Sequence, residues 1–119
     1  MGKYLKDFRS GDRKLIRVDY DVDITGWTFW FTMRRSFDDP ISHQVKTTPG
    51  DHPSDDPAAG IVHFEIDSAA SKLLSPGPYV WDIQVSKGGT PPDVITLLPP
   101  IEDINDKITV FQGVTQEDI

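Results

Sequence analysis

Residues 27–33 read Trp-Thr-Phe-Trp-Phe-Thr-Met, and this stretch decides the fold class. Bulky apolar side chains recur at every second position, which is typical of a β-strand with one buried face. The face that we expect to be buried carries Trp27, Phe29, Phe31 and Met33. Trp30 lies on the opposite face, where we expect an interface with a neighbouring subunit in preference to a carbohydrate.

The same period of two recurs along the chain. It is clear in residues 14–20, 61–66 and 79–85, and weaker in residues 41–47, 94–98 and 107–111. Clusters of proline and glycine between these segments indicate turns. A helix is predicted only at residues 68–74, capped by Asp67 or Ser68 and ended by Pro76. Together these signals predict an Ig-like antiparallel β-sandwich of about seven strands with one short helix.

Composition excludes several functional classes. The chain has 119 residues, which favours one domain over residues 1–119, and it has no cysteine, which excludes disulfides and thiolate metal sites. Its net charge of −7 argues against nucleic acid as a partner. No apolar run is long enough for membrane insertion, and the charged N-terminus does not resemble a secretory signal, so we expect synthesis in the host cytoplasm.

Several short motifs follow one another in a recognisable order. Residues 9–12 (Arg-Ser-Gly-Asp) and 23–27 (Asp-Ile-Thr-Gly-Trp) each precede a predicted strand. Later, residues 57–60 (Pro-Ala-Ala-Gly) lead into a strand, and residues 76–79 (Pro-Gly-Pro-Tyr) lead into 81–85 (Trp-Asp-Ile-Gln-Val). This order, over residues 8–112, resembles the Ig-like domains of phage tail and baseplate proteins. It is similar to the N-terminal domain of the baseplate upper protein.

Two features depart from that family. Residues 97–106 form a longer and more acidic connection than the family pattern has, and the chain ends at Ile119 without the fibre-attaching region of longer relatives. The resemblance implies a non-enzymatic structural subunit of a phage virion. We expect a tail or baseplate adaptor that anchors a fibre or receptor-binding protein, with other virion proteins, and copies of itself, as partners. Two alternatives stay open: a carbohydrate-binding β-sandwich module and an Ig-like capsid decoration protein.

No pattern of catalytic residues appears in the sequence, so we predict no enzymatic activity, no cofactor and no metal ion. Asp19, Asp21 and Asp23 have the spacing that begins an EF-hand, but Ile24 and Trp30 stand where that loop needs Gly and Glu. His43 and His63 occupy outward strand positions and are predicted to be surface histidines.

The loop of residues 49–60 contains four side chains that are able to offer oxygen or imidazole ligands. A proline-rich loop does not by itself predict the geometry of a metal site, so we expect an exposed, mobile loop that contacts a partner, and metal binding there stays open. Apolar residues near both termini are also expected to dock on partners. The predicted partner-binding residues are Tyr4, Leu5, Phe8, Trp30, Asp51, His52, Asp55, Asp56, Phe111 and Val114.

Overall fold

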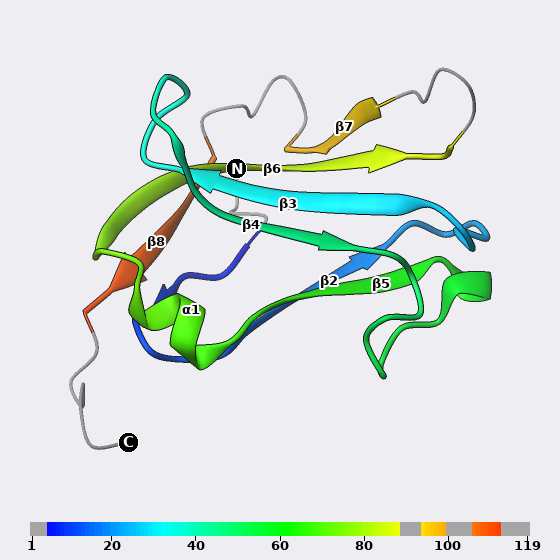
Figure 1. Cartoon of the computed structure of the whole chain (residues 1–119), viewed down its shortest axis with the longest axis horizontal. Helices are drawn as coiled ribbons and strands as arrows, with labels where there is room; N and C mark the ends of the chain where they lie inside the picture. Colours follow the sequence, from blue (N-terminus) through cyan, green and yellow to red (C-terminus); the bar gives the residue numbers. More distant parts are fainter. Residues whose placement is uncertain (1–4, 89–93, 100–105, 113–119) are drawn as a thin grey trace.

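The computed structural model describes residues 5–88, 94–99 and 106–112. Eight strands and two short helical segments follow one another in these ranges (Figure 1). In chain order they are β1 (Phe8–Arg9), β2 (Lys14–Asp19), β3 (Thr28–Arg34), β4 (Ile41–Thr47), the 3-10 helix η1 (Pro57–Ala59), β5 (Ile61–Ile66), α1 (Ser68–Lys72), β6 (Gly77–Ser86), β7 (Val94–Leu98) and β8 (Lys107–Phe111).

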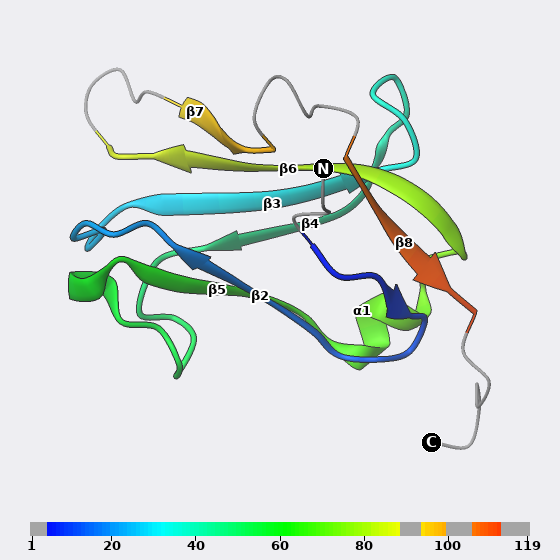
Figure 2. The ribbon, with the colours of Figure 1, turned by 180° about the vertical axis from the view of Figure 1, so that it is seen from behind.

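The strands form two sheets. The larger has six strands in the order β1-β8-β6-β3-β4, with β7 also paired to β6. Strand β6 is ten residues long, so β8 pairs with its first part and β7 with its last part. The smaller sheet is the antiparallel pair β2-β5, which lies across the larger sheet as a second layer (Figure 2).

The core lies between the two layers. Phe29, Phe31 and Met33 of β3 have no exposed surface, as the period of two predicts. From the smaller sheet, Phe64 packs against Phe29 and Phe31, with ring centroids 6.5 and 6.0 Å apart. Such aromatic contacts between facing sheets are the usual interior of a β-sandwich.

The predicted all-β class and the short helix are confirmed. Each of the seven predicted strand segments contains a strand, and the helix begins at Ser68 as predicted, although it ends at Lys72. Its cap is Asp67, whose Oδ1 accepts a hydrogen bond from the backbone N–H of Ala70 at 2.8 Å. In the part of the chain described, no helix combines the length and the apolar character needed to cross a membrane.

The prediction of a purely antiparallel sandwich was wrong in one respect. Strand β1 pairs with β8 in the parallel direction, with Phe8 opposite Val110. The side chain of Asp7 supports this pairing by accepting a hydrogen bond from the backbone N–H of Thr109 at 2.9 Å. A two-residue strand has too short a pattern to be detected from its sequence.

This pairing also corrects the prediction for the N-terminal segment. Phe8 is buried in the core of its own chain, so it is not free to dock on a partner. Leu5 packs against that core and stays partly exposed. Phe111, which follows Val110 on β8, is 51% exposed as expected. Tyr4 and Val114 lie outside the described residues.

Candidate functional site

The loop between β4 and β5 (residues 48–60) folds back over the outer face of β5, and one carboxylate organises it. The side chain of Asp55 has no exposed surface. Its Oδ2 accepts hydrogen bonds from the backbone N–H groups of Gly50 at 2.9 Å and His52 at 3.2 Å. The prediction of an exposed loop was therefore wrong at Asp55, although Asp51 and Asp56 are exposed as expected.

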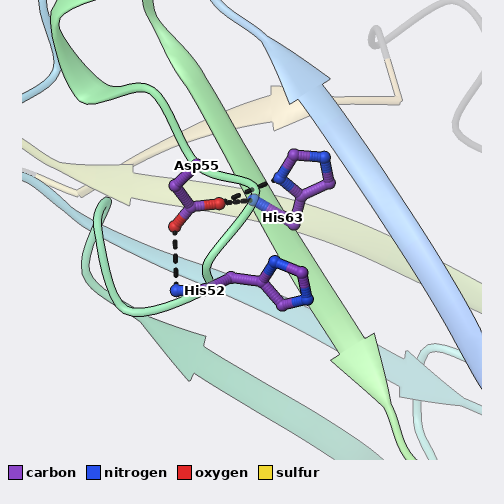
Figure 3. Close-up of side chains that lie close together, drawn as sticks. All are labelled: His52, Asp55 and His63. Carbon is purple, nitrogen blue, oxygen red and sulfur yellow. Dashed lines mark hydrogen bonds and ion pairs between the residues drawn. The ribbon is translucent and has the colours of Figure 1, made fainter.

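The second oxygen of Asp55 joins the loop to strand β5. Oδ1 accepts hydrogen bonds from the backbone N–H of His63 at 2.8 Å and from its ring Nδ1 at 2.9 Å (Figure 3). Burial alone would raise the pKa of Asp55, but the hydrogen bonds from His63, Gly50 and His52 outweigh it and hold the pKa below its ordinary value. An ionised carboxylate only accepts hydrogen bonds, so Nδ1 of His63 carries the proton.

His63 is not the surface histidine that its strand position predicts. It does face away from the core, but the loop covers it and leaves only 7% of its side chain exposed. His43, the other histidine expected at the surface, is half-buried, and burial lowers its pKa.

His52 lies beside His63, and their ring centroids are 5.2 Å apart (Figure 3). Its Nδ1 accepts a hydrogen bond from the backbone N–H of Ser54 at 3.1 Å, so in the neutral ring the proton is on Nε2. That Nε2 lies 3.2 Å from Oε1 of Glu65, which Arg13 also contacts at 2.9 Å. The Arg13 hydrogen bond is the main reason that the pKa of Glu65 lies below its ordinary value, and His52 adds to the effect.

We call His52, Asp55 and His63 the Asp55 cluster. One ligand atom from each, two ring nitrogens and one carboxylate oxygen, lie within 4.8 Å of one another. In its present protonation state the cluster is a hydrogen-bonded anchor that fixes the loop. The same atoms form a donor set of two nitrogens and one oxygen.

A second loop is fixed to the first. The segment between β2 and β3 (residues 20–27) donates backbone hydrogen bonds from Tyr20 to the carbonyl of Gly60 at 2.8 Å and from Ile24 to the carbonyl of Pro57 at 3.0 Å. A Cβ at Gly60 would lie 2.5 Å from the carbonyl oxygen of Val22, so only glycine allows this approach. We call residues 20–27 and 48–60 together the loop end.

Trp30 lies on the outer face of the large sheet, on β3. Lys46 of β4 and Gln84 of β6 stand directly opposite it on the two neighbouring strands. The Lys46 ammonium lies 6.0 Å from the Trp30 ring centroid, and the tryptophan is half-buried. Its outward direction is as predicted.

The structure therefore separates the predicted site residues into groups. Asp51, His52, Asp55 and Asp56 share the loop, whereas Trp30 lies on the outer sheet face and Phe111 near the end of β8. Sequence reasoning missed His63 and Glu65 as members of the loop site. Their i, i+2 spacing on β5 places both on the outer face, which was a usable signal, but nothing local showed that the loop would cover them.

No protein-family model matches the chain, and neither the curated proteins nor the solved structures contain a significant match.

Proposed function

We propose that this chain is a non-enzymatic structural subunit of a phage virion, an adaptor in the tail or baseplate that holds another protein in place. The virion role comes from the resemblance of residues 8–112 to Ig-like tail and baseplate domains. The observation that carries the adaptor role is the loop end, in which backbone hydrogen bonds join two separate loops. The buried Asp55 carboxylate fixes one of these loops to β5.

A fixed loop surface suits an adaptor because binding then costs little conformational entropy. The loop end also presents several carboxylates on exposed residues: Asp21, Asp23, Asp51 and Asp56. Val22, which lies between Asp21 and Asp23 in the sequence, is 50% exposed and offers an apolar contact. This combination favours a partner whose docking surface is basic around an apolar depression.

The virion role is tested by locating the chain in particles. An antibody raised against the purified chain, with a gold label, is applied to particles of the phage whose genome encodes it. Label at the tail tip is the expected result in electron micrographs. Label spread over the capsid would support the decoration alternative, and absence of the chain from particles would overturn a virion role.

The loop end is tested by charge reversal. Asp56→Lys should reduce the amount of chain incorporated into particles, because a cation replaces an exposed carboxylate facing the basic partner. Asp38→Lys is the matched control, since Asp38 is an exposed carboxylate in the β3–β4 turn, at the opposite end of the molecule (Figure 1). Equal incorporation of both variants, measured by immunoblotting, would exclude the loop end as the contact.

Trp30 supports a second candidate, the carbohydrate-binding module. Half-buried tryptophan rings stack on sugars, and Trp30 is flanked by two polar side chains able to hydrogen-bond hydroxyl groups, Lys46 and Gln84. This candidate is tested by measuring the binding of the intact chain and of Trp30→Ala to a panel of glycans. Binding that Trp30→Ala abolishes would favour the module, whereas no binding by the intact chain would reject it.

A further inference from the structure

We propose that the Asp55 cluster binds a divalent transition-metal ion, and we expect this ion to be Zn²⁺. The inference stands apart from the proposed virion role, because it depends only on the residues of the loop and β5. Two imidazoles and a carboxylate favour zinc and its neighbours over Ca²⁺ and Mg²⁺, which prefer oxygen ligands alone.

The spacing of the donor atoms supports the site. In a tetrahedral zinc site with bonds of about 2.1 Å, ligand atoms stand about 3.4 Å apart. Here Oδ1 of Asp55 and Nδ1 of His63 are 2.9 Å apart, and the three donor atoms lie within 4.8 Å. A metal ion would therefore widen the first pair slightly and draw in His52, which is carried by the loop and not by a strand.

The surroundings of His52 and Asp55 match those of ligands in a metal site. Metal-bound histidines usually donate their second ring N–H to a carboxylate, which fixes the tautomer and the ring direction. Glu65 holds Nε2 of His52 in this way, which leaves Nδ1 as the ligand atom. The backbone donors of Gly50 and His52 hold Oδ2 of Asp55, so its Oδ1 stays directed at His63.

Metal binding balances without a change in net protonation at neutral pH. The ion takes the place of the proton on Nδ1 of His63, that proton is taken up at Nε2, and the ring stays neutral. Nδ1 of His52 exchanges its hydrogen bond from Ser54 for the metal. Acid protonates the imidazoles and competes with the metal, so the affinity should fall as the pH is lowered.

The test uses the three histidines of the chain, because His52 and His63 belong to the site and His43 does not. Zinc chloride is titrated calorimetrically into the intact chain at neutral pH, and one bound ion per chain is expected. His52→Ala should weaken binding at least about tenfold, in line with the loss of a metal ligand. His43→Ala should bind as the intact chain does.

Several results would overturn the proposal. They are the absence of saturable zinc binding by the intact chain, undiminished binding by His52→Ala, and loss of binding on His43→Ala. Cobalt supplies an independent readout that needs no variant at the buried His63. The intact chain should give the visible absorption of tetrahedral Co²⁺, and the spectrum of octahedral aqueous Co²⁺ would contradict the site.

Discussion

At the residue scale, Asp55 is a fully buried carboxylate whose pKa lies below its ordinary value. A carboxylate without exposed surface accepts four hydrogen bonds from N–H groups, three of them in the backbone. These contacts join residues of the loop to β5, so the conformation of the loop depends on one side chain. If a substitution removes this acceptor, the buried N–H donors are left without any hydrogen-bond partner, because water does not reach them. The free energy lost is then larger than the net contribution of the hydrogen bonds themselves.

Asp55→Asn should lower the free energy of unfolding by about 3 kcal/mol. Both carboxylate oxygens of Asp55 accept hydrogen bonds, and asparagine replaces one of these acceptors with an NH₂ group that faces N–H donors. Urea unfolding followed by circular dichroism measures the difference. Asp56→Asn is the control, since Asp56 is the exposed neighbour and should change stability by less than about 0.5 kcal/mol. Equal stability of the two variants would contradict the anchor role of Asp55.

The lowered pKa of Asp55 also gives a direction with pH. A folded-state pKa below the unfolded value stabilises the fold above the unfolded pKa, about 3.9 for Asp, and this contribution is lost as the pH falls through the folded-state value. The intact chain should therefore lose stability in acid more steeply than Asp55→Asn does.

Asp82 presents the opposite case on β6. Its Oδ1 is buried and has no hydrogen-bond partner among the described residues, and burial raises the pKa of Asp82 despite the attraction of Arg34. Asp82→Asn should therefore stabilise the protein at neutral pH, by about 1 kcal/mol, because the charged form is the unfavourable one. A raised folded-state pKa means that the intact chain recovers this stability as the pH falls through that pKa, so the difference should shrink in mild acid and be gone by about pH 4, the unfolded value. A neutral-pH loss of stability would show that the carboxylate has a necessary partner.

At the scale of elements, the pairing of β1 with β8 determines what the N-terminal segment does. Phe8 and Phe111 are both apolar, both near a terminus and both on neighbouring strands. Phe8 is 8% exposed, whereas Phe111 is 51% exposed. The pleat explains the difference, because Phe8 shares a face with Val110 whereas Phe111, the next residue on β8, faces the other way.

Phe8→Ala should destabilise the protein by about 3 kcal/mol, since it leaves a cavity in the core. Phe111→Ala should change stability by less than about 0.5 kcal/mol, because the side chain it removes is half exposed. Thermal unfolding of both variants checks the contrast. Similar losses would mean that the two rings are equally buried and that the β1–β8 register is different.

At the loop end, a comparison of two glycines distinguishes the effect of close packing on stability from the effect of backbone strain. Gly26 and Gly60 have nearly equal φ angles, +83° and +82°, but only at Gly60 would a Cβ meet another backbone. Gly26→Ala should cost about 1 kcal/mol from the conformation alone. Gly60→Ala should cost about 3 kcal/mol, because the β2–β3 loop must also move away. Equal losses in urea unfolding would show that the two loops are not in contact.

At the scale of the whole molecule, the two layers differ in size, and the larger sheet keeps an open edge. Among the described strands β7 pairs only with β6. It carries no charge, and its Val94 and Ile95 are 53% and 50% exposed. An uncharged edge strand is a template for pairing with another chain. This edge is the surface that best suits contact with a second copy.

The purified chain should therefore have a solution mass above that of one chain, measured by size-exclusion chromatography with light scattering. Ile95→Lys should return it to the monomer, because a charge at an edge strand blocks pairing. Phe37→Lys changes a residue of similar exposure in the β3–β4 turn and should leave the mass unchanged. A monomer at every concentration would exclude self-pairing while leaving an adaptor that binds a different protein.

The sequence by itself determined the strand segments, the buried faces of β2, β3, β5 and β6 and the start of the helix. These features depend on neighbours two to four positions apart, so the pattern within residues 27–33 or 79–85 is enough to predict a strand there. Outward positions such as Trp30 were predictable for the same reason.

Only the tertiary structure decided which outward side chains are covered and which strands adjoin. The hydrogen bond between Asp7 and Thr109 spans 102 positions, and the burial of His63 depends on a loop that folds back over its strand. No local pattern encodes such contacts, because they form only when separate segments pack on one core. The Asp55 cluster therefore became visible only once the loop and β5 were placed together.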